Sequence, residues 1–397
     1  MRFRLMVVAF AAGAVPLAAQ QRVQLPIEDR AIGLRTQSLF SVGVEEGEPW
    51  ETFAQVWQVA FDRGGRLYVL DTGNHRVHVF DEAGKFIRSI GRRGNGPGEF
   101  QAPLGIAITS SNELVVNDVV RGIQLFSLDG AFLRTVAVED GSRVVSQIQP
   151  HGTDGFFGEL GPMHGLGTRF EGAPPPTPPR RIGYVPRSGA ARTLYAAPPP
   201  QTVEQRTETA PDRGFVAQMP IAFAPRLSWV ALPDGRGIAA ANGMDYRITL
   251  VDDRGTQTHV IERAIASRKV LQSDRDAFMK AAENETPLVV AGPNGPSGDL
   301  MREMQKQRLR NMRFAESMPV IQKLAMDPAG RIWVQRSGSR TADDGPIDLV
   351  SLDGRYLGTL TGQKIPSAFG PDGRVAYIEK DDLGVVKVAV RKISISS

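Results

Sequence analysis

The sequence predicts an all-β fold, a six-bladed β-propeller with four-stranded antiparallel blades and a helical insertion between blades four and five. Three observations predict it: a repeat with a period in the mid-forties, a glycine-containing turn at the same place in each copy, and four strand-like segments per copy. The chain has 397 residues, of which 41% are hydrophobic, so one repeat domain can occupy nearly all of it.

The repeat is clearest in the first third of the chain, where GRLYVLDTGNHRVHVFDEAGKFIRSI aligns with NELVVNDVVRGIQLFSLDGAFLRTV. Four pairs of equivalent residues lie 46 or 47 positions apart: Asp71 and Asp118, Phe80 and Phe126, Gly84 and Gly130, Phe86 and Phe132. Each copy contains strands in which apolar and polar residues alternate, separated by a polar turn and by a tight turn with Asp and Gly.

The turn that opens each copy recurs as DRGGRLYV, LPDGRGIAA, DPAGRIWV and GPDGRVAYI. Glycine supplies a positive φ there, and aspartate supplies a side chain that can bond its own backbone. A strand-like segment precedes each copy, for example VWQVAF before Asp62 and VIQKLAM before Asp327. The resulting four strands per copy are typical of a propeller blade.

Six blades fit the chain, at approximately 51–100, 101–141, 142–200, 225–266, 319–362 and 364–392. The third is the most irregular, with strands at FFGEL and in the hairpin RIGYVPRSGAARTLYA. Strands are also expected near the two ends, at 36–42 and 387–395. We expect the first of these to complete the last blade, because closing the ring removes two exposed sheet edges. Residues 21–397 are therefore predicted to form a single domain.

The segment DTGNHRVHVFDEAGKFIRSIGRRGNGPGEFQAP, at 71–103, resembles the repeat of the NHL-repeat six-bladed propellers. That repeat has D-x-x-N-x-R after a strand, then a second strand, a turn, I-G, a glycine-rich segment ending in Phe, and a proline. The second blade keeps Asp118 and Arg121 but lacks the asparagine and the glycine loop, and later blades keep only the turn and the strands. The resemblance implies the fold of a secreted bacterial six-bladed propeller.

The first twenty residues have the order of a secretory signal peptide. Arg2 and Arg4 precede an apolar run at 5–19 that ends in small residues, with expected cleavage near Ala19 or Gln20. A membrane anchor is the alternative, but this run contains a proline and is shorter than the roughly 20 residues that span a bilayer. We expect an exported protein, periplasmic or secreted, without a transmembrane segment.

Composition excludes several classes of function. The chain has no cysteine, which excludes disulfides, thiolate nucleophiles and cysteine-ligated zinc. Its formal net charge of +4 falls to +2 when Arg2 and Arg4 leave with the signal peptide. Because nucleic-acid binding needs a strong basic field, we expect no nucleic-acid partner.

Two motifs in the first blade could be mistaken for ligand sites. GRRGNGPGEF, at 91–100, lacks the G-K-[ST] and the following helix of a phosphate-binding loop, so it is predicted to be a crossover between blades. DTGNHR lacks the spaced oxygen ligands of a calcium loop. We expect Asp71 and Asn74 to bond the turn backbone and Arg76 to pair with a nearby carboxylate.

Metal and nucleophile patterns are also incomplete. The chain has five histidines, none at metal-binding helical spacing: His75, His78, His151, His164 and His259. A structural or surface role is expected for each. No G-x-S-x-G is present, so no serine nucleophile is predicted, and the sequence names no catalytic or metal-ligating residue.

Three long segments interrupt the blades, at 161–181, 267–317 and 337–348. They occupy the connection after the second strand of a blade or the crossover to the next blade, and both of these leave a four-stranded blade from the same end. Repeat folds place insertions on the binding face. We therefore expect a decorated top face over the central channel.

The largest insertion is predicted to hold two helices. Ser273 and Asp276 have capping-box spacing for a helix at 274–285, and Ser297 or Asp299 can cap a second at 300–316. The second carries methionines on one face and basic residues on the other. It fits either a helix that binds an anionic membrane or a partner, or a lid packed on the propeller rim, which we favour.

Polar residues expected on the top face form the candidate ligand-binding site: Asp71, His75, Arg76, Asp118, Arg121, Asn242, Asp245, Arg247, Arg336, Arg340 and Asp343. The excess of arginine suits an anionic ligand, because the planar guanidinium matches carboxylate and phosphate.

Two functions follow from this sequence. The first is a non-catalytic extracytoplasmic propeller that binds an anionic small molecule, a peptide, a glycan or a protein on its top face, without a cofactor. The alternative is a metal-assisted lyase or lactonase. Propellers similar to this one include peptide-amidating lyases, antibiotic-ring lyases and sugar-lactone hydrolases, in which a metal in the central channel polarises the substrate carbonyl.

Overall fold

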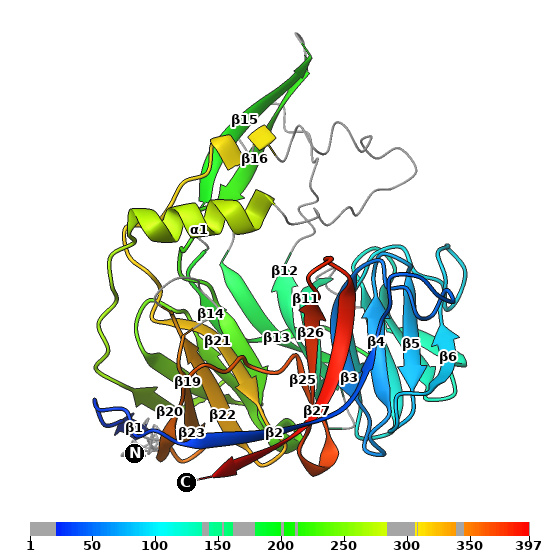
Figure 1. Ribbon diagram of the computed structural model, residues 1–397, viewed down its shortest axis with the longest axis horizontal. Helices are drawn as coiled ribbons and strands as arrows, with labels where there is room; N and C mark the ends of the chain where they lie inside the picture. The colour runs from blue at the N-terminus through cyan, green and yellow to red at the C-terminus, as the bar shows by residue number, and fades with distance from the viewer. Residues whose placement is uncertain are drawn as a thin grey trace, which may run out of the picture.

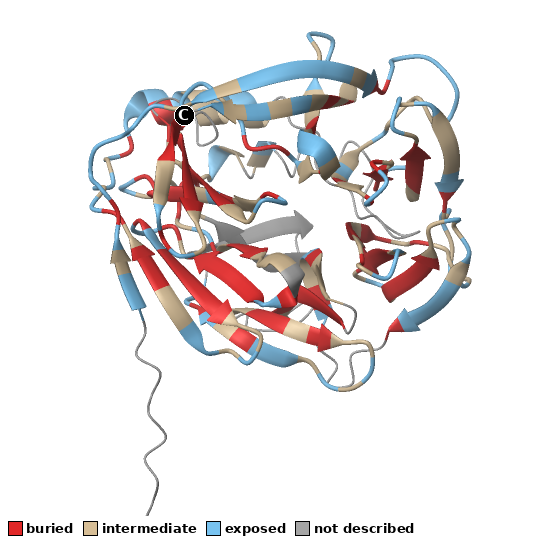
Figure 2. Cartoon of the chain, turned by 90° about the horizontal axis from the view of Figure 1, so that it is seen from below, coloured by how far each residue is buried: buried red, intermediate tan, exposed pale blue. Residues whose placement is uncertain are grey.

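The computed structural model describes residues 21–136, 143–152, 155–161, 179–199, 202–210, 213–283, 306–307, 309–338 and 345–396. It is a six-bladed β-propeller in which each blade contains four antiparallel strands (Figure 1). Viewed from below, the blades are arranged in a ring with buried residues concentrated on their strands (Figure 2). The predicted fold class is confirmed.

The blades follow one another along the chain, and each runs from an inner to an outer strand. Blades one to three comprise β3 (Val56–Phe61), β4 (Leu67–Asp71), β5 (Arg76–Phe80) and β6 (Phe86–Ile90); β7 (Pro103–Ile108), β8 (Glu113–Asp118), β9 (Gly122–Ser127) and β10 (Phe132–Val136); β11 (Arg143–His151), β12 (Gly155–Gly161), β13 (Arg180–Pro186) and β14 (Arg192–Ala197).

Blades four to six comprise β17 (Ser228–Ala231), β18 (Gly237–Ala241), β19 (Arg247–Asp252) and β20 (Gln257–Glu262); β21 (Ile321–Met326), β22 (Arg331–Arg336), β23 (Ile347–Ser351) and β24 (Tyr356–Leu360); β25 (Ala368–Phe369), β26 (Arg374–Lys380), β27 (Val386–Ser396) and β2 (Gly33–Val42). Short 3-10 turns connect two inner strands to their neighbours, η1 (Pro233–Gly235) and η2 (Pro371–Gly373). The first five predicted blade ranges each contain one of these sheets, whereas the sheet of blade six extends beyond 364–392, because β27 runs to Ser396 and β2 comes from the N-terminal part of the chain.

The hydrophobic core is divided into layers between neighbouring blades. Tyr68 of blade one packs with Phe126 of blade two, and Val115 of blade two packs with Phe156 of blade three. Equivalent clusters fill the remaining blade interfaces around the ring. Because each blade is covered on both faces, central strands such as β4 are buried along their whole length instead of alternating.

The turns between strands have the chemistry that the repeat predicts. At the first turn of blade one, Asp62 Oδ1 accepts a hydrogen bond from the Arg66 amide at 2.9 Å, and Gly65 has a φ of 87°. Blade five repeats the pattern: Asp327 accepts from the Arg331 amide at 3.0 Å. These side chains satisfy backbone amides that a strand ladder leaves free.

The segment at 21–42, which we call the N-terminal belt, closes the ring over three blades. β1 (Gln21–Gln24) adds a parallel fifth strand to blade four, beside β20. The amide of Ile32 then donates to the Thr359 carbonyl on the outer strand of blade five at 3.1 Å. Finally, β2 pairs with β27 as the outer strand of blade six, as predicted, and thus covers an edge that would otherwise be exposed. The contacts with blades four and five were not predicted.

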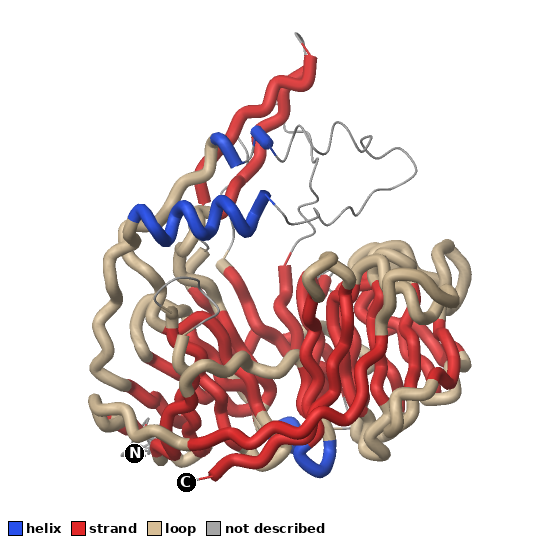
Figure 3. The backbone as a smooth tube through the Cα atoms, viewed as in Figure 1, coloured by secondary structure: helices blue, strands red, loops and turns tan. Residues whose placement is uncertain are grey.

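A helix and a hairpin project from one end of the ring (Figures 1 and 3). The helix α1 (Gln272–Glu283) confirms a helix near 274–285, but it begins earlier than predicted. The proposed cap by Ser273 and Asp276 is wrong, since Asp274 Oδ2 accepts from the Leu271 amide at 2.8 Å at the start of the helix. The hairpin of β15 (Thr202–Ala210) and β16 (Arg213–Pro220) was not predicted.

The second predicted helix is only partly within the described residues. Residues 306–307 and 309–310 are helical, whereas residues 311–316 are not, and Phe314 forms a parallel bridge with Ala222. The expected helix at 300–316 is therefore wrong at its C-terminal end. Its proposed caps, Ser297 and Asp299, lie outside the described residues. No helix in the described ranges is long and apolar enough to cross a bilayer.

Candidate functional site

One end of the propeller carries the elaborate connections. Strands alternate in direction within each blade, so the connection after the second strand and the crossover to the next blade leave from the same end. We call this end the insertion face. Helix α1 and the β15–β16 hairpin both belong to such crossovers, and Figure 1 shows them beyond the same end of the ring.

Two predicted site residues, Asp71 and Asp118, serve the fold at this face. Asp71 is fully buried, and its carboxylate accepts from the amides of Ala54 at 3.1 Å and Gln55 at 2.8 Å. Asn74 donates its side-chain amide to the same carboxylate at 2.8 Å. Both aspartates thus join a crossover to a turn, and the predicted backbone bonding of Asp71 is confirmed.

Asp118 repeats this arrangement in blade two. Its carboxylate accepts four hydrogen bonds, all from backbone amides. Oδ2 accepts those of Gln101 at 2.7 Å and Ala102 at 3.0 Å, and Oδ1 accepts those of Val120 and Arg121, both at 2.9 Å. The structural need to satisfy these amides explains why an aspartate recurs at this position of the repeat.

Blades four and five contribute arginines that already have carboxylate partners. Arg247 Nη2 lies 2.6 Å from Glu262 Oε1, and Arg247 Nε lies 3.8 Å from the exposed Asp245. Arg336 Nη2 lies 2.6 Å from Asp29 Oδ2, in the N-terminal belt.

Asn242 accepts the Met244 amide at 3.2 Å within the turn of blade four. The remaining predictions in these blades, Arg340 and Asp343, lie outside the described residues. Every described prediction of blades four and five is thus placed at the insertion-face ends of its strands.

Blades one and two place the other predicted residues without an ion partner. His75 ends the turn before β5 with a φ of 54°, and Arg76 follows it. Neither Arg76 nor Arg121 forms an ion pair with any residue that the structure describes, so the expected carboxylate partner of Arg76 is not found. Both arginine side chains are only partly buried. They supply positive charge at adjacent blades of the insertion face.

The apolar part of this face was not predicted from the sequence. Of nine exposed large hydrophobic side chains in the described chain, five lie in insertion-face connections: Val44, Val120, Met244, Leu271 and Leu383. Met244 is 57% exposed and Leu383 is 78% exposed. The described turns at the opposite end carry none, and the other four lie on strands or in the belt. A search for apolar residues at the predicted turn tips would have identified them.

A separate apolar cluster anchors α1 beneath this face. Phe223, Val270 and Met318 are buried together, and Phe278 of α1 meets Phe314 with ring centroids 5.7 Å apart. The helix start is held by an ion pair of 2.6 Å between Arg268 and the fully buried Asp274. The hydrogen bonds from Arg268 outweigh the burial and lower the pKa of Asp274. Helix α1 is therefore a fixed part of the insertion face.

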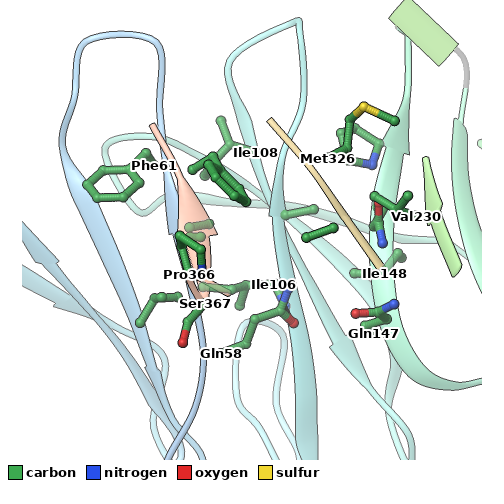
Figure 4. Close-up of a pocket in the computed structure, with 18 of the residues that line it drawn as sticks. Gln58, Phe61, Ile106, Ile108, Gln147, Ile148, Val230, Met326, Pro366 and Ser367 are labelled. Carbon is green, nitrogen blue, oxygen red and sulfur yellow. Dashed lines mark hydrogen bonds between the residues drawn. The ribbon is translucent and has the colours of Figure 1, made fainter. Parts of the chain in front are cut away.

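A second feature is a cavity of about 420 Å³ in the central channel (Figure 4). All six inner strands line it, or the residues directly before them. Its polar lining consists of glutamines, Ser367 and Lys323, and none of its lining residues is an Asp, Glu or His. Within the described ranges, no three His, Asp or Glu side chains are grouped so that they could hold a metal ion. The residues placed here do not match the ligand set of a channel metal, and we derive no step through one.

Two of the described histidines have structural surroundings. His78 is fully buried, and its Nδ1 lies 2.8 Å from Ser89 Oγ. Burial lowers its pKa from 6.5 to about 4. His151 packs against Phe157 and Tyr184 with centroid distances of 4.9 and 4.6 Å. His164 lies outside the described residues.

The glycine-rich segment at 91–100 is the crossover between β6 and β7, as predicted. The carboxylate of Glu99 closes this loop, because it accepts hydrogen bonds from the Gly96 amide and from Arg92 Nε, both at 2.7 Å. Phe100 is buried between blades one and two. The loop is thus folded on its own side chains.

Comparison with known proteins supports the fold. Residues 52–151, 100 of the 397 residues, match a family model described as a 6-bladed beta-propeller. The RING finger protein nhl-1 of Caenorhabditis elegans is 42% identical over 55 residues, which are 14% of this chain and 6% of that protein. The chain therefore spans only a small part of that relative.

Two solved structures are similar over most of their length. A protein from Bacteroides vulgatus matches with a TM-score of 0.52 at 11% identity, covering 93% of this chain and 100% of that one. A gluconolactonase from Xanthomonas campestris matches with a TM-score of 0.41 at 14% identity, covering 93% and 91%. At these identities the likeness concerns the fold alone. The chain is a six-bladed propeller, and the predicted likeness to NHL repeats is consistent with the family-model match and with the match to nhl-1.

Proposed function

We propose that this chain is an exported binding propeller whose insertion face holds a protein partner through an apolar and acidic surface of that partner. The observation that carries the proposal is the gathering of five exposed apolar side chains in the connections of one end. Single exposed apolar residues are ordinary, but their concentration on one face is typical of an interaction site.

Charge on the same face defines the chemistry of the partner. Arg76 and Arg121 stand on adjacent blades without a described ion partner, and arginine forms paired hydrogen bonds with carboxylates. Arginine and methionine are also enriched at protein interfaces. A surface that combines acidic and apolar side chains would complement both groups. An anionic small molecule or a glycan would use the arginines but leave the apolar side chains in water.

The scaffold under this face is suited to recognition. The turns of blades one and two are tied to the crossovers by Asp71 and Asp118, and α1 is fixed by its aromatic cluster and by Arg268. A face held in one conformation loses little conformational entropy on binding. The signal-peptide pattern supports an encounter outside the cytoplasm.

The experiment compares three substitutions on this face with two elsewhere. The tagged full chain is expressed in its native cells as wild type, as Val120→Asp, Met244→Asp, Leu383→Asp, and as the control Leu39→Asp, Leu133→Asp. The control residues are exposed on β2 and β10, so all variants are expected to fold. We expect one partner protein to be recovered in stoichiometric amount with the wild type and with the control. Its recovery should fall at least tenfold with the triple variant. Equal recovery with the triple variant, or no stoichiometric partner at all, would refute the proposal.

A further inference from the structure

The wall of the channel cavity carries an exposed tryptophan. The structure describes all four tryptophans of the chain, and only Trp57 is exposed, at 44%. It lines the cavity of about 420 Å³, a volume within the range of small-molecule sites, roughly 300–1,000 Å³. Because an indole is large and mostly apolar, a ligand that covers its exposed face gains free energy of binding.

A bulge in the inner strand of blade one places Trp57 at the cavity. β3 pairs with β4 at Val56 and next at Gln58, so Trp57 is an extra residue without a partner in the ladder. Such bulges redirect side chains and are common beside binding sites. The bulge therefore explains why this large side chain is not packed between two blades.

Two glutamines extend toward each other from opposite walls of the channel, Gln58 of blade one and Gln147 of blade three (Figure 4). Gln58 Oε1 accepts from the Ile106 amide of blade two at 3.1 Å, and Gln147 Nε2 donates to the Trp229 carbonyl of blade four at 3.2 Å. Each glutamine thus uses one end of its amide to join two blades. The other ends, Gln58 Nε2 and Gln147 Oε1, are accessible and have no partner among the described residues.

A serine adds a second donor close to Gln58. Ser367 directly precedes β25 of blade six, which adjoins β3 in the ring, and Figure 4 shows it near Gln58. Its Oγ accepts from the Ile378 amide at 3.2 Å, so the hydroxyl hydrogen is left to donate into the cavity. We assign no role to Lys323 of the lining, which already interacts with another group of the chain.

We propose that the central channel binds a neutral sugar, with a ring stacked on Trp57 and hydroxyl groups bonded to Gln58, Gln147 and Ser367. A hydroxyl both donates and accepts, so a sugar can satisfy the donors of Gln58 and Ser367 and the acceptor of Gln147 together. A carboxylate would be repelled by the Gln147 oxygen. An ammonium group would be repelled by the two donors.

The rest of the site agrees with this ligand class. The C–H face of a sugar ring is apolar and flat enough to cover an indole. The bonds between blades hold both glutamines in place before a ligand enters, so binding costs little conformational entropy. This site is distinct from the insertion face and does not depend on its proposed partner.

The test is calorimetric titration of the purified protein with glucose, galactose, mannose, xylose, N-acetylglucosamine, maltose and cellobiose. We expect saturable binding of at least one of these sugars. Sorbitol, which carries hydroxyl groups but has no ring, should bind at least tenfold more weakly than the best sugar of the panel.

Substitutions locate the sugar in the channel. Trp57→Ala should weaken binding of the best sugar at least tenfold, and Gln147→Met should weaken it at least fivefold. The matched controls are Trp50→Phe and Gln37→Met, which should bind as wild type. Trp50 stacks on Phe86 in the first blade, and Gln37 is exposed on β2.

Tryptophan fluorescence gives a second readout with a milder substitution. The sugar should change the fluorescence of the wild type and of Trp50→Phe, and change it far less in Trp57→Phe. No saturable binding of any sugar of the panel would overturn the proposal, as would unchanged affinity in Trp57→Ala or Gln147→Met. Equal affinities for sorbitol and the best sugar would refute stacking on Trp57.

Discussion

Replacing Arg263 with methionine should strongly destabilise the closure of the ring. The Arg263 side chain is fully buried and donates to the carbonyls of Pro26 at 2.7 Å, Ile27 at 3.2 Å and Glu28 at 2.9 Å. It also bonds the carboxylates of Asp29 at 2.7 Å and Asp348 at 2.8 Å. One side chain thus joins the N-terminal belt to blades four and five.

The magnitude follows from what the substitution leaves behind. Asp348 is fully buried and would keep the hydrogen bond from Thr359 at 2.6 Å, with Arg336 Nε at 3.5 Å. Removing one member of a buried ion pair typically costs about 3–5 kcal/mol, because the other charge stays buried. We expect Arg263→Met to lower the free energy of unfolding by an amount in that range.

Denaturant unfolding of the purified protein measures this effect. Lys387→Met is the control, because it removes a cation from a partly exposed pair and should cost about 0–1 kcal/mol. The double variant Arg263→Met, Asp348→Leu should recover part of the loss, since it leaves no uncompensated charge. A cost below about 1 kcal/mol for Arg263→Met would refute the role that we assign to this side chain.

Three further substitutions test other parts of the fold. His78→Gln should remove a pH dependence: burial lowers the pKa of His78 from 6.5 to about 4. As the pH falls, the imidazole of His78 is therefore protonated in the unfolded chain before it is protonated in the folded protein. Between about pH 6.5 and pH 4, the free energy of unfolding should fall by about 3 kcal/mol more in wild type than in the variant. Parallel curves of unfolding free energy against pH would contradict it. Asp118→Asn should lower the free energy of unfolding by at least about 2 kcal/mol, measured by thermal unfolding, because an NH2 group would face two of the four amide donors. The control Asp129→Asn, on an exposed turn, should leave the free energy of unfolding nearly unchanged. Equal unfolding midpoints for the two variants would argue against the structural role of Asp118. Gly237→Ala should destabilise by more than about 1 kcal/mol, since the φ of 134° is unfavourable for alanine and its Cβ would meet the Val251 carbonyl. An unchanged melting temperature would contradict this prediction and show that β18 accommodates the alanine side chain.

The fold could be predicted because each blade repeats the same local chemistry. Asp62 and Asp327 show why a turn with aspartate and glycine marks each copy: the side chain and the positive φ are both needed by the backbone. Ring closure by the strand at 36–42 could be predicted from the requirement that a propeller leave no long edge exposed.

The parts that could not be predicted depend on contacts between distant segments. The belt contacts of Arg263 join residues more than 200 positions apart, and no local pattern around Arg263 indicates them. The predicted helix at 300–316 was wrong at its C-terminal end because Phe314 pairs with Ala222 and packs against α1. Tertiary contacts there outweigh helical periodicity.

The ligand-binding role of the candidate site stays a prediction, whereas the common end of the insertions could be predicted. The repeat correctly indicated which connections share one end, because strand direction alternates. It could not distinguish arginines that pair with a carboxylate of the fold from arginines that do not. Arg336 reaches Asp29 of the belt, whereas Arg76 and Arg121 have no ion partner among the described residues. The exposed apolar turn tips were not predicted, because an apolar residue in a turn does not by itself indicate a binding site.

Site-specific photo-crosslinking in native cells tests the central proposal most directly. A photoreactive amino acid is placed at Val120, Met244 or Leu383 on the insertion face, and at Leu39 or Leu133 on the outer strands. The proposal predicts one crosslinked protein from the first three positions, attached through a segment with apolar and acidic residues, and none from the other two. Crosslinks from the outer strands alone, or no crosslink from the insertion face, would contradict the assignment of this face as the binding surface.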